Sequence, residues 1–200
     1  NVVLSYGMET AFFRFYNKED NKSKVISTST ISLFWSTIGF LILFLLFRKN
    51  LALWSEINVE YVVFTIWILA LDALAIIPFS KIRAEGRPIK YAVIKISNVV
   101  INLSLNIFFL AFLPNWAANT DNVFIQTIYY EGFQIGYIFV SNLIASLFTL
   151  LFVLPDYFKI KWQFDADLWK KMMQYGLPIL VAGIAFAINE HFDKILLDWM

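Results

Sequence analysis

The stretch ILALDALAIIPFSKIRAEGRP, from Ile68 to Pro88, decides what kind of fold this sequence can form. It places one aspartate, Asp72, inside a run of isoleucine, leucine and alanine, and ends that run with a proline and a basic cluster. A buried aspartate needs a polar partner in a soluble core, and it needs one even more in lipid. In lipid, the basic cluster would also mark the cytoplasmic side of the membrane.

The composition favours lipid as the solvent of this chain. Of its 200 residues, 60% are hydrophobic and 16% are charged, and the mean hydropathy is +0.66. Soluble domains are about 45–50% apolar and about 25% charged, so too little polar surface remains here to cover a soluble core. The net charge of +1 gives no indication of nucleic acid, and the absence of cysteine excludes disulfides and thiolate chemistry.

Five apolar stretches have the length of a membrane span, which is about 20 residues. They are Ile26–Phe47, Tyr61–Ser80, Tyr91–Leu113, Gly132–Leu154 and Tyr175–Leu197. A sixth element, Asn1–Tyr16, is expected to be the end of a further span, and Pro114 and Pro155 are expected to end the third and fourth. The prediction is an all-α integral membrane protein built as a bundle of transmembrane helices. Because the chain starts at Asn and ends just after an apolar run, we expect an internal piece of a longer protein.

Basic residues are unevenly distributed over the connections between these spans. One set of alternate connections carries Arg14, Lys18, Lys22, Lys24, Lys81, Arg83, Arg87, Lys90, Lys95, Lys159, Lys161, Lys170 and Lys171. The other set carries only Arg48 and Lys49. By the positive-inside rule, the first set is cytoplasmic. Tyr61, Tyr91, Tyr175, Trp116 and Trp199 lie near span ends, as interfacial aromatic residues do.

The longest cytoplasmic connection, Pro155–Gln174, divides the predicted domains. Residues 1–154 would form the first bundle, 155–174 a linker and 175–200 the first helix of a second bundle. Within the linker, Asp165 is suited to cap a short helix at the membrane surface. An ordinary surface loop facing anionic lipid is the alternative interpretation.

Several polar side chains lie at membrane depth. At ~1.5 Å per residue, Asp72, Glu9 and Asn98 are each about 10–13 Å from the cytoplasmic edge. Asn98, Asn102 and Asn106 follow each other at intervals of four and share one helix face. These groups either join helices by hydrogen bonds or line a hydrated cavity, and Arg14 and Lys95 are candidate partners of the two acids.

The last span combines a polar cluster with two helix-modifying residues. Gly176 and Pro178 are expected in its first turn. Asn189 and Asp193 offer oxygen ligands on one face, while Glu190 is spaced to pair with Lys194. The cluster is either a site for Na⁺ or H⁺ or an internally neutralised patch.

Three blocks of the sequence carry a resemblance to a known family. They are YGMETAFFRF (Tyr6–Phe15), LDALAIIPFSKIRAEGRP (Leu71–Pro88) and YGLPIL…INEHFDKILL (Tyr175–Leu197). In this order they resemble polysaccharide or lipid-linked oligosaccharide flippases of the multidrug/oligosaccharidyl-lipid/polysaccharide exporter superfamily. The resemblance implies part of a two-bundle, MATE-like fold with alternating access, in the bacterial inner membrane, with the rest of the polypeptide supplying the second bundle.

The resemblance also implies a function: movement of an undecaprenyl-diphosphate-linked saccharide from the cytoplasmic to the outer leaflet. It implies that Arg14 contacts the diphosphate headgroup. Their depth in the membrane makes Glu9, Asp72 and the three asparagines the further candidates for cavity residues. Asp193 matches by position an acidic residue that couples transport to Na⁺ or H⁺ in some relatives, with Asn189 and Glu190 beside it. No other cofactor, no metal site and no catalytic residue is predicted.

Three alternatives remain open from the sequence. A multidrug or cation antiporter of the same fold would use Asp72 and Glu9 to hold organic cations. A membrane-embedded transferase would use His191, the single histidine, as a base. A non-transporting scaffold would also explain the spans, although it does not require the asparagine face.

Overall fold

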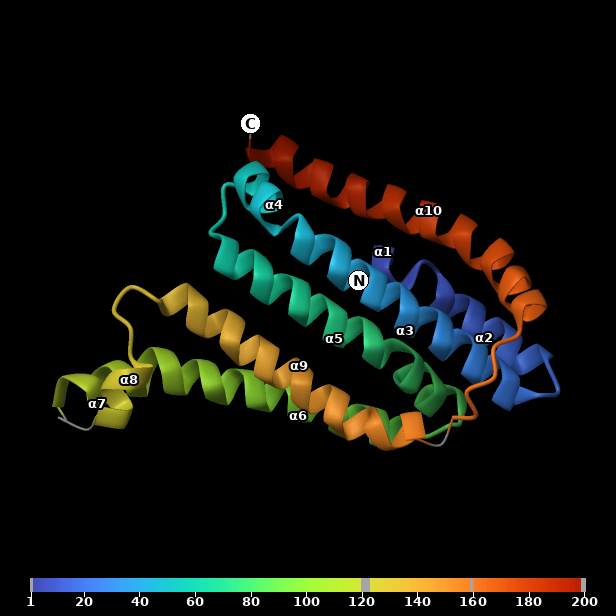
Figure 1. Ribbon diagram of the computed structural model, residues 1–200, viewed down its shortest axis with the longest axis horizontal. Helices are drawn as coiled ribbons and strands as arrows, with labels where there is room; N and C mark the ends of the chain where they lie inside the picture. The colour runs from blue at the N-terminus through green and yellow to red at the C-terminus, as the bar shows by residue number, and fades with distance from the viewer. Residues whose placement is uncertain (1, 120–122, 159, 199–200) are drawn as a thin grey trace. The chain divides into compact units, whose positions relative to one another are not determined.

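The structure is a computed structural model that describes residues 2–119, 123–158 and 160–198, and every described element is helical (Figure 1). Side chains are described except at 2–3, 123–124, 187 and 190–198. The elements are α1 (Val2–Ser5), α2 (Met8–Lys18), α3 (Lys22–Leu46), α4 (Arg48–Ser55), α5 (Val59–Ala84), α6 (Pro88–Ile107), the π-helical η1 (Phe108–Phe112), α7 (Leu113–Asn119), α8 (Val123–Ile128), α9 (Gln134–Phe158) and α10 (Ala166–Asp198).

Four of the five predicted spans correspond to long apolar helices. In the described part of the chain, the segments long and apolar enough to cross a membrane are Lys22–Leu46, Val59–Ala84, Pro88–Asn119 and Gln134–Phe158. The prediction of an all-helical fold is therefore confirmed for the described residues, and four of the predicted spans have the length and composition needed to cross a membrane. The fifth predicted span lies within α10, whose last turns have no described side chains, and it stays a prediction.

Three prolines lie inside helices where the sequence predicted helix ends or starts. Pro155 is within α9, Pro178 is well inside α10, and Pro114 is in α7, which continues the helical path of α6 and η1. Before Pro114, the amide of Leu113 donates to the carbonyl of Phe108, a π-helical spacing that shifts the bonding register ahead of the proline. Membrane helices tolerate proline because neighbouring groups satisfy the freed carbonyls.

The N-terminal element is interrupted, whereas a continuous span end was predicted. Tyr6 and Gly7 separate α1 from α2, and their φ angles are 35° and 73°. This left-handed conformation breaks the helix, and at Gly7 it costs little because glycine has no Cβ.

The described chain divides into two compact units. Unit 1 contains residues up to Gly39, Ala73–Arg87 and the chain from Pro155 onward. Unit 2 contains Phe40–Asp72 and Pro88–Leu154. The boundaries at 154 and 175 that the sequence suggested stay predictions.

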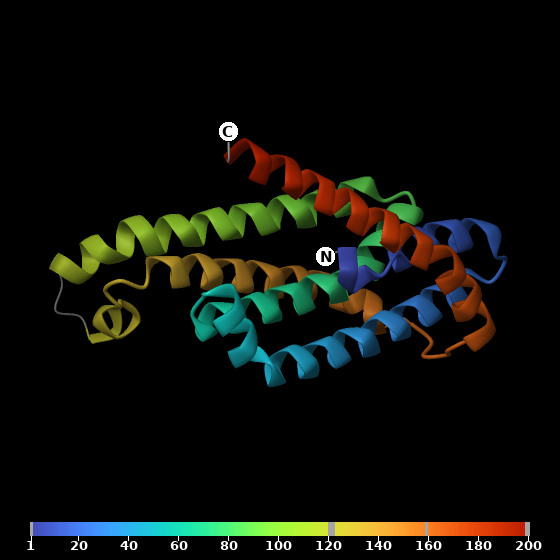
Figure 2. The same ribbon diagram turned by 90° about the horizontal axis from the view of Figure 1, so that it is seen from above.

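Unit 1 is built on α2 and α10, which lie beside each other in both Figure 1 and Figure 2. The core contains apolar residues from α2, α3, α5 and α10, including the fully buried Met8, Phe12 and Met172. Leu168 and Met172 are both buried in this core. The short helix that Asp165 was predicted to cap is not separate, because it forms the first turns of α10.

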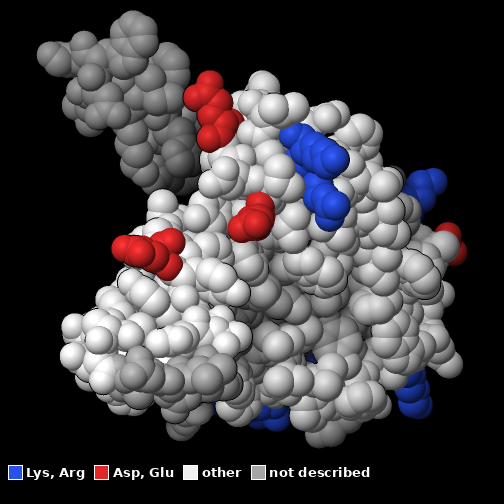
Figure 3. Space-filling model, turned by 60° about the vertical axis from the view of Figure 1, so that its left-hand side comes forward, with Lys and Arg blue, Asp and Glu red and all other residues white. Residues whose placement is uncertain are grey.

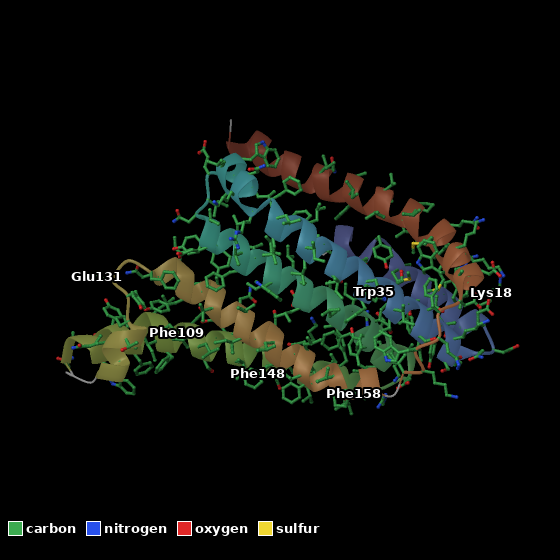
Figure 4. All side chains as sticks on the ribbon, in the orientation of Figure 1. Lys18, Trp35, Phe109, Glu131, Phe148 and Phe158 are labelled. Atoms are coloured by element: carbon green, nitrogen blue, oxygen red, sulfur yellow. The ribbon has the colours of Figure 1, made fainter. Side chains whose placement is uncertain are left out.

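Unit 2 is held by aromatic contacts and by closely packed small residues. The rings of Tyr61 and Phe139 stack at 5.4 Å between α5 and α9, and Tyr137 stacks on Phe109 at 5.1 Å. Ser141 and Ala145 of α9 are small residues four positions apart, and both are fully buried. Figure 4 shows Phe148 projecting from α9, where its side chain is 43% exposed.

Figure 3 shows one face of the molecule, and most of the described surface visible there is uncharged. Large apolar residues of α6 are exposed, among them Ile96, Val100 and Leu103. Such surface would be unfavourable in water but suits acyl chains.

Candidate functional site

Arg14, the residue predicted to contact a headgroup, lies on the exposed side of α2 in unit 1. Its guanidinium carbon is 4.1 Å from the ring centroid of Tyr175 on α10. A cation at this distance from an aromatic ring is held in place while its N–H groups stay available to other acceptors. Arg14 forms no ion pair with any carboxylate among the residues whose side chains are described.

Glu9 has a partner that the sequence analysis did not name. Its carboxylate pairs with the guanidinium of Arg83 near the end of α5, and that guanidinium is also 4.9 Å from the ring of Phe13. The suggested pairing of Glu9 with Arg14 is therefore wrong. The residues are close to each other on α2, but Glu9 lies on the side that faces α5.

The backbones of α2 and α10 approach each other at two glycines. A Cβ built on Gly7 would lie 2.1 Å from the carbonyl oxygen of Gly176, and one built on Gly176 would lie 3.1 Å from the carbonyl oxygen of Gly7. Each glycine follows a tyrosine in the blocks YGMET and YGLPI. Together with the pairs Arg14–Tyr175 and Glu9–Arg83, this contact brings parts of all three resemblance blocks together in unit 1.

Asp72 and the three asparagines lie in unit 2 and are connected by hydrogen bonds between helices. Ser146 Oγ donates to Asp72 Oδ1 at 2.9 Å, which answers the question of what holds this aspartate. The amide of Asn98 donates to Thr149 Oγ1 at 2.9 Å.

Asn102 and Asn106 continue the same row. Asn102 donates to Asn142 Oδ1 at 3.3 Å, and Asn106 donates to Asn102 Oδ1 at 2.6 Å. The acceptor oxygen Oδ1 of Asn106 is buried and has no hydrogen-bond partner among the described residues. We call this row, with Asn98, Asp72 and their α9 partners, the polar seam.

For the polar residues at membrane depth, the sequence left two interpretations open: hydrogen bonds that join helices, or the lining of a hydrated cavity. Polar side chains of α6 face α9, while the residues between them, such as Val100 and Leu103, are exposed. Hydrogen bonds between helices thus account for Asn98, Asn102 and Asp72. A hydrated cavity beside these residues stays a prediction.

The coupling-ion candidates fall at the end of α10. Asn189 is exposed, whereas the side chains of Glu190, His191, Asp193 and Lys194 lie outside the described part of the structure. The ion site, the Glu190–Lys194 pair and the role of His191 are therefore left as predictions. Among the residues that the structure describes, no group of three or more His, Cys, Asp and Glu side chains is arranged to hold a metal ion.

Two ionic groups of unit 1 contain ion pairs that the sequence analysis did not name. Lys81 lies 3.6 Å from the buried carboxylate of Asp156 and 4.0 Å from Glu85, which also pairs with Arg87. Asp156 had a detectable signal, since it directly follows Pro155 and is the single charged residue of α9.

The second group surrounds Asp165, whose capping role was predicted and is confirmed. Asp165 Oδ1 accepts the amide of Leu168 at 2.8 Å, and its carboxylate pairs with Lys24. The Leu168 hydrogen bond and the Lys24 charge lower the pKa of Asp165. The segment before it also contacts α3, because Ser27 Oγ donates to the carbonyl of Gln163 at 2.8 Å.

Comparison of the chain with protein-family models, with curated proteins and with solved structures finds no match.

Proposed function

We propose that the protein takes part in moving a lipid-linked, diphosphate-bearing saccharide across the bacterial inner membrane by alternating access. The observation that carries this proposal is the convergence of the three resemblance blocks in unit 1. Glu9–Arg83, Arg14–Tyr175 and Gly7–Gly176 join residues that are far apart in sequence but belong to those blocks.

The chemistry of Arg14 suits the headgroup of such a substrate. Arginine stays charged and offers paired N–H donors that match phosphate oxygens. Tyr175 orients the guanidinium from one side, so its edge remains open for a diphosphate. With the cell interior negative, outward movement of about two negative charges gains roughly 4–5 kcal/mol per 100 mV.

The cation-antiporter alternative has less support. It needs acidic side chains that are available to an organic cation. Glu9 is instead paired with Arg83, and Asp72 accepts a hydrogen bond from Ser146.

The test measures flipping of a fluorescent polyprenyl-diphosphate saccharide in vesicles that contain the full-length protein. Arg14→Ala should lower the flipping rate at least about tenfold, because a hydrogen bond to a charged group contributes ~1.5–3 kcal/mol. Arg14→Lys should restore only part of it, since lysine lacks the paired donors. Lys18→Ala is the matched control, because it removes one exposed charge from the same helix. Equal rates for Arg14→Ala and Lys18→Ala would exclude the headgroup role.

A further inference from the structure

Unit 1 contains a groove that the proposed function does not use. It runs between α3 and α10, has a volume of about 810 Å³ and is lined mainly by apolar atoms. Trp35 and Ser36 line it from α3, and Trp169, Met173 and Leu177 line it from α10. Trp35 is 64% exposed and is labelled in Figure 4.

The few polar atoms of the groove bond to one another. Trp169 Nε1 donates to Ser32 Oγ at 2.7 Å, and Ser32 Oγ is 2.7 Å from the hydroxyl of Tyr6. Ser36 Oγ lies 3.5 Å from the same hydroxyl and 3.0 Å from the carbonyl of Leu33, to which it donates. Because these groups satisfy each other, the groove presents an apolar surface and fixes the orientation of its aromatic walls.

The length of the groove matches one membrane leaflet. Trp169 and Leu177 are eight positions apart on α10, which corresponds to ~12 Å at ~1.5 Å per residue. Half of the hydrocarbon layer is about 15 Å thick, so a chain of one leaflet fits this length, whereas a long polyprenyl chain would extend beyond it.

A basic residue lies near the end of the groove that we expect to be cytoplasmic. Lys170 is exposed and precedes Met173 by three positions, so both are on the same side of α10. A lysine near the membrane surface favours an anionic headgroup by about 1 kcal/mol.

We propose that this groove binds one acyl chain of an anionic phospholipid of the cytoplasmic leaflet, with the headgroup near Lys170. The site is separate from the headgroup role of Arg14. Tyr175, which stacks on Arg14, is two positions from both Met173 and Leu177 and so points to another side of α10.

The test uses the full-length protein in vesicles of phosphatidylcholine with increasing amounts of phosphatidylglycerol that carries brominated acyl chains. Bromine quenches tryptophan, and Trp35 and Trp169 both line the groove. We expect a saturable quenching phase at a low fraction of brominated lipid, in addition to the linear quenching caused by random contact. Ser36→Phe should remove the saturable phase by filling the groove. Ser104→Phe should retain it, because Ser104 is an exposed serine of α6 that does not line the groove.

Lys170→Gln tests the headgroup without changing the packing of the groove. It should reduce the preference for phosphatidylglycerol over phosphatidylcholine about fivefold, which corresponds to the ~1 kcal/mol of one lysine. Three results would overturn the proposal: no saturable phase in the wild type, equal loss in Ser36→Phe and Ser104→Phe, or displacement of the brominated lipid by equimolar polyprenyl diphosphate. The last result would assign the groove to the substrate. None of them depends on Arg14 or on transport, so this inference can fail independently of the proposed function.

Discussion

At the scale of single residues, Gly7 allows the backbones of α2 and α10 to approach each other closely in unit 1. Its φ of 73° lies in the left-handed region, and the carbonyl of Gly176 occupies the space where a Cβ would lie. The position therefore excludes side chains for two independent reasons, conformational and steric. Gly176 has the steric constraint alone and a less severe one, because the nearest atom is 3.1 Å from its built Cβ.

We predict that Gly7→Ala destabilises the protein more than Gly176→Ala does. The conformational part should cost ~1–2 kcal/mol, and the clash should add to it. Gly86→Ala, at φ 69° in open space, measures the conformational part, and Gly39→Ala, also in open space, is the neutral control. Thermal unfolding in detergent, followed by size-exclusion chromatography, gives the order of stabilities. If Gly7→Ala is no worse than Gly86→Ala, the close approach of α2 and α10 is not present in solution.

Asp165 leads to a prediction about pH. Because its folded-state pKa lies below the ordinary value of 3.8, the ionised carboxylate stabilises the fold above that value. The contribution disappears as the pH falls through the lowered pKa. Asp165→Asn keeps a capping oxygen but has no charge to titrate, so the unfolding temperature of this variant should change less than that of the wild type between pH 5 and pH 3 (about the range of an acidic titration).

The control for this experiment is Asp167→Asn, which changes an exposed acid in the first turn of the same helix. It should retain the pH dependence of the wild type. The same pH profile in the wild type and Asp165→Asn would contradict the capping interaction.

At the scale of the elements, α6 reverses the usual arrangement of a soluble amphipathic helix. Its asparagines face α9, and its exposed side carries residues such as Val100 and Leu103. In lipid this arrangement is favourable, since apolar side chains lose nothing by exposure and amides gain partners between helices. The same reasoning explains why Asp72 is tolerated inside α5, as it has Ser146 as a donor.

We predict that Ser146→Ala destabilises unit 2 by about 1–2 kcal/mol, because it leaves the Asp72 carboxylate without this donor. Asn98→Ala should cost less, about 0.6 kcal/mol, the average for a hydrogen bond between membrane helices. Ser104→Ala, on the exposed side of α6, should be neutral. Denaturation in mixed micelles measures all three. If Ser146→Ala in an Asp72→Ala background is as costly as in the wild type, the two residues are not coupled.

At the scale of the whole molecule, the distribution of charge gives an orientation in the membrane. The connections around Asn21 and Arg87 carry many basic residues, while those around Asn58 and Glu131 carry few. The four long apolar helices alternate between these two sets of connections. The positive-inside rule then predicts that the first set is cytoplasmic.

Because the chain has no cysteine, this orientation can be tested with single cysteine substitutions. Asn58→Cys and Glu131→Cys should react with a membrane-impermeant maleimide in intact cells. Asn21→Cys and Arg87→Cys should react only after permeabilisation. The reverse pattern, or the same reactivity at all four positions, would reject the predicted topology.

The sequence by itself predicted lipid as the solvent and determined the helical fold class and the approximate helices, because a helix in lipid must satisfy its own backbone and needs a long apolar run to cross the membrane. It also predicted the cap at Asp165 and the shared face of the three asparagines, which depend on short-range spacing alone. Only the tertiary structure decided the partners: Arg83 for Glu9, Ser146 for Asp72, Tyr175 for Arg14 and Gly176 for Gly7. These contacts join residues far apart in the chain. Spacing along one helix cannot predict them, because they depend on how separate helices pack against each other.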